Sequence, residues 1–450
     1  MQEHTDLRWL VQTSLGEATS SARGRDGKQG MRGCTRALAM LAAVTACDIG
    51  HSVAPAAGAC DDRLKLPAGF CAQVFADDLG ALRHIAVAPS GDVYVARWAT
   101  ANEPGGLVAL RDTNHDGRVD VTRWIENSGG AGLALTADAV YMATWTEVLR
   151  YPLVDGALLP RAHPDSIVVG LPRSGHGARS IVVADGRLYL NVGAPSNSCQ
   201  AHDKQLHAPG RDPCPELRRF AGLWSFDPLR RHQRQPDGER IVTGVRHLVA
   251  LAYRTTDRTL YAVQHGRDDL SQTFPEAFSR EAGERLAAEE MFRLERGNDY
   301  GWPYCYYDDA QRQKLLAPEY GGDGRTVGRC ATATAPIFAF PAHWAPNGLL
   351  FYTGTMFPPR YRGGAFVAFH GAWYRPGPDN GFNVVFLPFA AQDPGPRFEI
   401  FADGFAGRDR HPGRARHRPV GLAQGLDGAL FITDDVRGRI WKVIYRSPPA

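Results

Sequence analysis

The stretch Asp92-Val-Tyr-Val-Ala96, preceded by His84-Ile-Ala-Val-Ala88 and followed by Gly106-Leu-Val-Ala-Leu110, shows the unit from which this chain is built. Pro89-Ser-Gly91 separates the first two apolar runs. Turn residues between short runs rich in Val, Ile and Tyr are typical of a β-hairpin. The three runs therefore predict three consecutive antiparallel strands.

The same unit recurs along the chain. Its central aromatic strand returns in Ala139-Val-Tyr-Met-Ala143, Arg187-Leu-Tyr-Leu-Asn191, Thr259-Leu-Tyr-Ala-Val263, Leu349-Leu-Phe-Tyr352 and Ala429-Leu-Phe-Ile-Thr433. Third strands follow at residues 147–151, 222–226, 290–294, 383–387 and 439–443. Such a unit cannot bury both of its faces alone, whereas radial stacking covers both. The repeats predict an all-β, six-bladed β-propeller over residues 61–450, with short helical insertions such as a charged segment at 275–296.

The composition narrows the class of protein. The chain has 450 residues, of which 44% are hydrophobic, and this is enough apolar material for a large packed core. The formal net charge is only +3, which argues against nucleic acid as a partner. No apolar run reaches the roughly 18–20 residues that a membrane-spanning helix needs.

Residues 1–60 differ from the rest and predict a disordered extension followed by an export signal. A second start at Met31 is followed by basic residues and by the apolar run Ala37-Leu-Ala-Met-Leu-Ala-Ala-Val44, which is typical of a signal segment. Cys47 ends a lipoprotein-type box, so a lipid anchor at Cys47 competes with ordinary cleavage near Ala57-Gly58-Ala59. Either reading predicts an exported, periplasmic protein.

The cysteines after Cys47 are even in number, which suggests disulfides in an exported chain. Local pairing is the simplest arrangement, and it predicts the bridges Cys60–Cys71, Cys199–Cys214 and Cys305–Cys330.

Basic residues gather beside the predicted inner strands. Because a propeller binds ligands at one end of its central channel, these side chains should converge on a single mouth and favour a compact anion. The alternative for any one of them is a charged, solvated rim. They are Arg83, His84, His176, Arg179, Arg246, His247, His265, Arg267, Arg416, His417 and Arg418.

Two further motifs allow a chemical and a plain structural interpretation. His176, in Ser174-Gly-His-Gly-Ala178, is a candidate general base because imidazole accepts a proton near neutral pH, although a loop histidine is more often simply exposed. Asp112, Asn114 and Asp116 stand at alternate positions before a glycine, as in a calcium loop. Arg123 stands where such a loop usually has glutamate, which favours a plain Asp/Asn/Gly turn for the second motif.

From Leu66 to Tyr445 the chain resembles the soluble pyrroloquinoline quinone (PQQ) dependent glucose, aldose and sorbosone dehydrogenases. Gly-Trp-Pro followed by aromatic residues is fairly specific to that family. The phrases that carry the resemblance are Leu66-Pro-Ala-Gly-Phe70, residues 112–120, Gln264-His-Gly-Arg-Asp268, Tyr300-Gly-Trp-Pro-Tyr-Cys-Tyr306, Pro341-Ala-His-Trp-Ala-Pro346, Phe369-His-Gly-Ala-Trp373, His417-Arg-Pro-Val-Gly421 and Thr433-Asp-Asp435.

The resemblance implies a set of roles for residues of this chain. His176 matches the histidine that takes a proton from the substrate hydroxyl while hydride passes to the quinone. Arg246 matches an arginine that binds the cofactor and assists the reaction, and Arg418 matches a second cofactor arginine. The other implied cofactor contacts are His247, His265, Asp434 (with Asp435 as its substitute) and Arg375, and calcium is expected at the backbone of Gly266 and Arg267.

The sequence also departs from the family at His247, where asparagine is usual, at Arg267, where proline is usual, and at Arg375, where the glucose enzymes carry lysine. The leading interpretation is a PQQ- and calcium-dependent oxidoreductase that acts on a sugar or related polyol or aldehyde and passes electrons to an external acceptor. The alternatives are a calcium-dependent, lactonase-like propeller hydrolase and a catalytically silent sugar-binding propeller.

Overall fold

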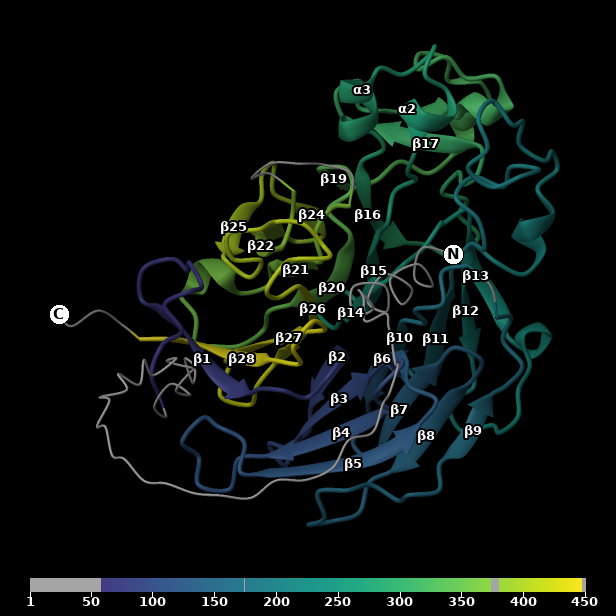
Figure 1. Ribbon diagram of the computed structural model, residues 1–450. Helices are drawn as coiled ribbons and strands as arrows, with labels where there is room; N and C mark the ends of the chain where they lie inside the picture. Colours follow the sequence, from purple (N-terminus) through teal and green to yellow (C-terminus); the bar gives the residue numbers. More distant parts are fainter. Residues whose placement is uncertain (1–57, 174, 374–379, 447–450) are drawn as a thin grey trace, which may run out of the picture.

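A computed structural model of the chain describes residues 58–173, 175–373 and 380–446. The described part contains six four-stranded antiparallel sheets. In five of them the strands follow the order of the sequence from the inner to the outer strand. In the sixth, the outer strand is β1, which comes from the start of the described chain. Figure 1 shows these sheets arranged as blades around a common centre. The prediction of an all-β, six-bladed propeller is therefore confirmed.

The blades are numbered in chain order, and their strands are given from the centre outward. Blade 1 holds β2 (Leu82–Val87), β3 (Val93–Arg97), β4 (Gly105–Arg111) and β5 (Val121–Asn127); blade 2 holds β6 (Gly130–Leu135), β7 (Ala139–Thr144), β8 (Val148–Pro152) and β9 (Asp165–Val168); blade 3 holds β10 (Ile181–Ala184), β11 (Arg187–Val192), β12 (Gly222–Phe226) and β13 (Glu239–Thr243). Blade 4 holds β14 (Ala250–Arg254), β15 (Thr259–Gln264), β16 (Glu289–Leu294) and β19 (Phe338–Phe340); blade 5 holds β20 (Pro346–Phe351), β21 (Ala365–Phe369), β22 (Asn383–Leu387) and β25 (Glu399–Ala402); blade 6 holds β26 (Pro419–Gln424), β27 (Leu430–Asp434), β28 (Ile440–Tyr445) and β1 (Phe70–Ala76).

The ring is closed by β1, which comes first in the described chain but forms the outer strand of the last blade. It pairs antiparallel with β28 in a register that places Phe70 opposite Tyr445. Each inner strand contacts the inner strands of both neighbouring blades, and these six strands surround the centre in Figure 1. Apolar residues on facing blade surfaces fill the space between blades, so the core is divided into clusters, one for each pair of neighbours.

One strand assignment was wrong. Leu349–Tyr352 was expected to form the second strand of its blade, but residues 346–351 form the inner strand β20, and the second strand is β21. Both strands carry phenylalanine, so the aromatic signal could not tell them apart. Tyr352 directly follows β20 and stacks on Phe357 at a centroid distance of 4.6 Å, which anchors the long connection to β21.

The insertions of blades 3 to 5 carry the short helices and the small two-stranded sheets. Blade 4 bears a module with its own small core around Leu270, Phe278 and Tyr306, which lies at the top of Figure 1. Only residues 280–285 of the predicted insertion at 275–296 are helical, because β16 begins at Glu289. The elements outside the blades are α2 (Leu270–Thr273), α3 (Arg280–Arg285), β17 (Cys305–Asp308), β18 (Gln313–Leu316), β23 (Phe389–Ala390), β24 (Asp393–Pro394), η1 (Pro215–Arg218), η2 (Gln235–Asp237), η3 (Pro318–Tyr320), η4 (Gly328–Thr332) and η5 (Pro359–Tyr361).

The three predicted disulfides, Cys60–Cys71, Cys199–Cys214 and Cys305–Cys330, are confirmed. The predicted signal segment, including Met31 and the proposed lipid site Cys47, lies outside the described residues, and so does Arg375. Among the described residues no helix combines the length and the apolarity needed to cross a bilayer.

Candidate active site

The blade topology decides which loops meet at one end of the channel. Neighbouring strands are antiparallel, so the loops that enter the inner strands lie on the same face as the loops that join second and third strands. The basic residues predicted from the sequence lie in these two kinds of loop or in the first residues of an inner strand. The centre of this face, where these loops converge, is called the mouth. Its polar residues are Arg83, His84, His176, Arg246, His247, His265, Asp268, His370, Arg418 and Asp435.

The calcium-like loop lies elsewhere. Asp112, Asn114 and Asp116 follow β4 and precede β5, a connection that lies on the opposite face of the blade. Their oxygens accept backbone N–H groups of the turn: Asp112 Oδ2 from Gly117 at 2.9 Å, Asn114 Oδ1 from Asp116 at 2.9 Å, and Asp116 Oδ1 from Arg118 at 2.9 Å. The structure therefore does not bring this motif to the mouth, and its geometry is that of a hydrogen-bonded turn.

Three histidines from blades 3 and 4 form a row in the mouth. The ring centroids of His176 and His247 are 4.7 Å apart, and those of His247 and His265 are 5.3 Å apart. Gly193 makes this approach possible, because a Cβ at that position would lie 2.6 Å from His247 Cδ2 and 2.9 Å from His176 Cβ. The row thus depends on a position where only glycine fits.

His176 is held in one tautomer. Its Nδ1 lies 2.6 Å from the carbonyl oxygen of Ala194, and a carbonyl can only accept, so Nδ1 carries the proton and Nε2 is the basic nitrogen. Burial, and then the positive charge of Arg246, lower the pKa of His176 well below its usual 6.5. The loop is not loose: a Cβ at Gly175 would lie 2.0 Å from Pro195 Cα, and one at Gly177 would lie 2.4 Å from the ring of Trp145. His176 therefore presents a neutral, oriented base.

The other histidines of the mouth are also fixed and neutral. His247 Nε2 donates to the Ala178 carbonyl at 3.1 Å, and burial lowers its pKa well below the ordinary value. His265 Nε2 lies 3.0 Å from Asn347 Oδ1, while His84 Nε2 donates to the Asn347 carbonyl at 3.0 Å. Burial lowers the pKa of both His265 and His84 to about 4. Asn347 thereby ties blade 4 to blade 1 across the mouth.

Arg246 is the buried cation of the blade 4 side. Its Nη1 donates to the Gly266 carbonyl at 2.8 Å, and its Nη2 donates to Asn197 Oδ1 and Asp268 Oδ2, both at 3.1 Å. Burial opposes ionisation of Asp268, but Arg246 and His343 hold the pKa of this carboxyl well below its ordinary value. Arg246 and Asp268 therefore form a charged pair beneath the histidine row.

The opposite side of the mouth is built by blades 1, 5 and 6. Asp435 accepts hydrogen bonds from Arg83 Nη1 and from His370 Nε2, both at 2.8 Å. Arg418 Nε donates to the His370 carbonyl at 2.9 Å. Asp434, the carboxylate first matched to the cofactor, is fully buried behind the mouth and caps the backbone N–H groups of Arg418 (2.7 Å) and Arg437 (2.9 Å). The acidic group that faces the mouth is thus its neighbour, Asp435.

Two residues near the expected calcium position have structural partners. Arg267 is 4% exposed and pairs with Glu319 through Nη1 at 2.5 Å and Nη2 at 2.8 Å. Glu289, which the sequence analysis did not single out, is buried and accepts the Gly266 N–H at 2.6 Å and the Ala345 N–H at 3.0 Å. Burial raises the pKa of Glu289 to about 7. Its position at the start of a buried strand gave no sequence signal for this role.

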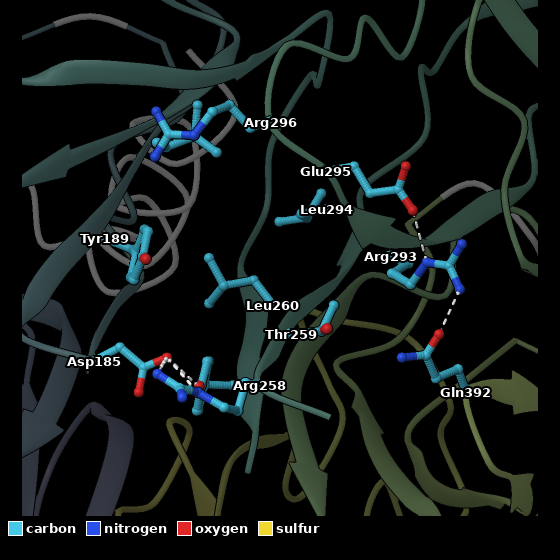
Figure 2. A pocket seen from close by; sticks show the side chains of 12 residues that line it. Asp185, Tyr189, Arg258, Thr259, Leu260, Arg293, Leu294, Glu295, Arg296 and Gln392 are labelled. Atoms are coloured by element: carbon cyan, nitrogen blue, oxygen red, sulfur yellow. Dashed lines mark hydrogen bonds and ion pairs between the residues drawn. The ribbon is translucent and has the colours of Figure 1, made fainter. Parts of the chain in front are cut away.

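A hollow of about 360 Å³ lies between blades 3 and 4 on the face opposite the mouth. Figure 2 shows Arg258 beside Asp185, and Arg293 bonded to both Glu295 and Gln392. The mouth, in contrast, brings together a row of three histidine rings with the buried arginines Arg83, Arg246 and Arg418 from three blades. The mouth is therefore the better candidate for an active site.

The TrAA12-like family model matches residues 64–446, which is most of the chain. The chain belongs to the TrAA12-like family. This confirms the resemblance to soluble PQQ-dependent sugar dehydrogenases that the sequence indicated.

Several solved structures share the fold of this TrAA12-like chain. The holo form of the pyranose dehydrogenase PQQ domain from Coprinopsis cinerea is 18% identical with a TM-score of 0.68, and the match covers 85% of this chain and 97% of that one. The calcium structure of the family AA12 protein from Trichoderma reesei is 18% identical with a TM-score of 0.69, at the same coverage. The PQQ-bound aldose sugar dehydrogenase from Streptomyces coelicolor is 16% identical with a TM-score of 0.53, covering 84% and 99%. At these identities the likeness establishes the fold.

A partial sequence match to one further protein does not indicate an activity. An uncharacterized protein of Borreliella burgdorferi is 27% identical over 209 residues, which are 46% of this chain and 49% of the relative. The TrAA12-like chain thus spans about half the length of this relative.

Proposed function

We propose that this protein is a quinoprotein oxidoreductase that oxidises a C–OH group of a sugar or a related polyol or aldehyde with PQQ as its cofactor. The TrAA12-like family and the PQQ-bound structures of similar fold support the cofactor and the substrate class. The observation that carries the proposal is the state of His176. Its imidazole is neutral, with the proton fixed on Nδ1, so the basic Nε2 is left for the substrate. His176 also lies next to His247 in the row of three histidines.

The mouth residues suit a compact ligand with several carboxylates. Three arginines, Arg83, Arg246 and Arg418, face two mouth carboxylates, Asp268 and Asp435. The buried guanidinium nitrogens Arg83 Nε and Arg246 Nε also have no hydrogen-bond partner among the described residues. Unpartnered buried donors are unfavourable, so an anion with oxygen acceptors would stabilise this arrangement. We assign Arg83, Arg246 and Arg418 to the cofactor carboxylates, with His247 and His265 beside its ring.

Calcium is the second component that the resemblance implies, and its expected ligands are engaged in this structure. The Gly266 carbonyl accepts the Arg246 hydrogen bond at 2.8 Å, and an ion at this oxygen would require Arg246 to turn away. Among the described residues, one cluster of side chains has the spacing of a metal site, namely Cys199, Cys214 and Glu216. Its two cysteines are bonded to each other in a disulfide and so are not available as thiolate ligands. We therefore assign no catalytic step to calcium and treat its addition as a variable in the experiment.

The protein's own groups account for binding and proton transfer. Bound PQQ supplies an electrophilic quinone that accepts hydride. His176 Nε2 takes the proton from the oxygen of the hydroxyl group whose carbon loses hydride, and the Ala194 carbonyl keeps the imidazole oriented as its charge changes. Arg246, held by Gly266, Asn197 and Asp268, would stabilise negative charge on a bound cofactor. An external acceptor would take up the electrons.

The setting of the reaction is part of the same proposal. Export to the periplasm, with either cleavage of the leader or a lipid anchor at Cys47, would place the enzyme where disulfides form. The three disulfides of the described chain support an oxidising compartment.

The proposal is tested by reconstitution. The purified protein is titrated with PQQ, with and without calcium, and binding is followed by absorbance and by melting temperature. Reduction of an artificial dye is then measured over a panel of aldoses, polyols and hydroxy-aldehydes. Saturable PQQ binding with sugar-dependent dye reduction is the expected result. Sugar binding without dye reduction would favour the catalytically silent propeller, and the absence of any PQQ effect would overturn the assignment.

A further inference from the structure

A basic pocket lies between the segment that precedes β1 and the loop between β25 and β26. The two segments are joined by the Lys65 N–H to Asp403 carbonyl bond at 2.8 Å and by the return bond at 3.0 Å. Gly404 allows this contact, because a Cβ there would lie 2.3 Å from the Arg63 carbonyl oxygen. Between them the segments enclose about 310 Å³. We call this space the outer pocket.

The outer pocket is strongly cationic. The acidic residues of its lining are Asp61 and Asp403, and each is already paired: Asp61 with Arg63 at 2.5 Å and Asp403 with Arg410 at 2.9 Å. Among the described residues the side chains of Lys65, Arg408 and Arg416 have no carboxylate partner. The basic residues of the lining are Arg63, Lys65, Arg408, Arg410, Arg416 and His417.

The electrostatics of Arg416 reflect this excess charge. Its pKa is lowered by burial and then by the positive charges of Arg63, Arg437 and Arg439, which outweigh the opposite effect of Asp61. Like charges that lower one another's proton affinity create a positive potential, and a bound anion would relieve it.

A buried nitrogen of the lining is left without a partner. His417 is 4% exposed, and its Nδ1 lies 2.8 Å from Asp434 Oδ2. Its Nε2, on the other side of the ring, is buried and has no hydrogen-bond partner among the described residues. An oxyanion accepts from this nitrogen when it is protonated, and monohydrogen phosphate can donate its O–H when it is not. The lining of the pocket thus combines surface cations with a histidine that has one buried, unpartnered nitrogen.

We propose that the outer pocket binds a compact tetrahedral oxyanion, of the phosphate or sulfate type, either as the free ion or as an ester group on a saccharide. Several guanidinium and ammonium groups around one small cavity match the geometry and charge of such an ion. Asp434 joins this pocket to the mouth, because it accepts both the His417 Nδ1–H at 2.8 Å and the backbone N–H of Arg418 at 2.7 Å. The proposal does not depend on the redox assignment.

The test is calorimetry with inorganic phosphate on the cofactor-free protein at constant ionic strength. One ion should bind per chain, and Arg416→Ala should weaken binding at least tenfold while Arg416→Lys retains most of it. Arg416 is exposed, so its removal should leave the fold unchanged. Arg230→Ala, an exposed arginine of blade 3 that pairs with Asp237, is the matched control and should bind phosphate like the parent protein.

Glucose 6-phosphate and glucose separate the two sources of the anion. Tighter binding of the sugar phosphate than of phosphate would identify an ester ligand, equal affinities would identify the free ion, and both results would support the proposal. Binding of glucose as strong as that of glucose 6-phosphate would overturn it. So would the absence of saturable phosphate binding, or a loss of affinity in Arg230→Ala equal to that in Arg416→Ala.

Discussion

The imidazole Nδ1 of His176 lies 2.6 Å from the carbonyl oxygen of Ala194, and this contact fixes which ring nitrogen can act as a base. Replacing His176 with Ala should lower kcat by roughly 10²- to 10⁴-fold, the usual contribution of a general base, while leaving PQQ affinity almost unchanged. Dye reduction and PQQ titration on the same preparation check this. His163→Ala, an exposed histidine of blade 2, should behave like the parent protein. Full activity in His176→Ala would remove the base assignment.

The neutral histidines predict that acid destabilises the fold. The pKa values of His84, His265 and His370 are lowered to about 4, chiefly by burial, whereas the unfolded chain titrates near 6.5. Between these values the unfolded state binds more protons, so the free energy of unfolding should fall as the pH drops from about 6.5 to 4. Urea unfolding at pH 7.5, 6 and 5 measures this slope.

His265→Gln should reduce this pH dependence, because glutamine can still donate to Asn347 but takes up no proton. His163→Gln serves as the exposed control and should leave the slope unchanged. An identical slope in His265→Gln and the parent protein would show that the buried histidine does not contribute.

Because Arg246 and Asp268 form a buried ion pair, we expect single and double substitutions to affect stability and PQQ affinity differently. Arg246→Met leaves Asp268 buried with His343 as its remaining ionic partner, so it should lower the free energy of unfolding by about 3–5 kcal/mol and weaken PQQ binding. Adding Asp268→Asn should recover much of the stability but none of the PQQ affinity. Urea unfolding and PQQ titration measure the two effects separately. Recovery of both together would mean that Arg246 acts through the fold rather than through the cofactor.

Gly193 predicts a loss of activity from one added methyl group. Its Cβ would meet His247 Cδ2 at 2.6 Å and His176 Cβ at 2.9 Å, so Gly193→Ala should displace the histidine row. We expect a fall in kcat of at least tenfold with a loss of stability of about 1–3 kcal/mol, as for other overpacked sites. Steady-state kinetics measure the change in kcat, and thermal unfolding measures the change in stability. Gly413→Ala, at an exposed turn, is the control, and unchanged kinetics in Gly193→Ala would contradict the close approach.

The Cys199–Cys214 disulfide predicts a link between the blade 3 insertion and the mouth. It closes a segment of 15 residues, so its loss in Cys199→Ser/Cys214→Ser should lower stability by about 3 kcal/mol. Asn197, two residues before Cys199, bonds to Arg246, and PQQ affinity should therefore fall as well. The matched variant Cys60→Ser/Cys71→Ser removes the bridge that ties Cys60 to Cys71 in β1, and it should lose stability without this effect on PQQ binding. Equal PQQ affinity in both variants would contradict the link.

Much of the architecture can be predicted from the sequence. The recurring hairpin phrase predicted the blades, because a period-2 apolar pattern between turn residues reports local strand formation. The same signal failed at blade 5, where β20 and β21 both carry phenylalanine and only the pairing of the strands distinguishes them. The outer strand β1 was also missed as a member of the last blade, since pairing between residues 70 and 445 leaves no local pattern.

The sequence by itself determined the repeat, the local disulfides and the kinds of side chain available to the mouth, because these depend on residues close together in the chain. Only the tertiary structure decided that Asp435 rather than Asp434 faces the mouth, that Arg267 is taken by Glu319, and that Asp112 lies on the opposite face. The reason is physical: side chains from distant blades become neighbours only when the ring closes. Their partners, tautomers and pKa values are set by that closure.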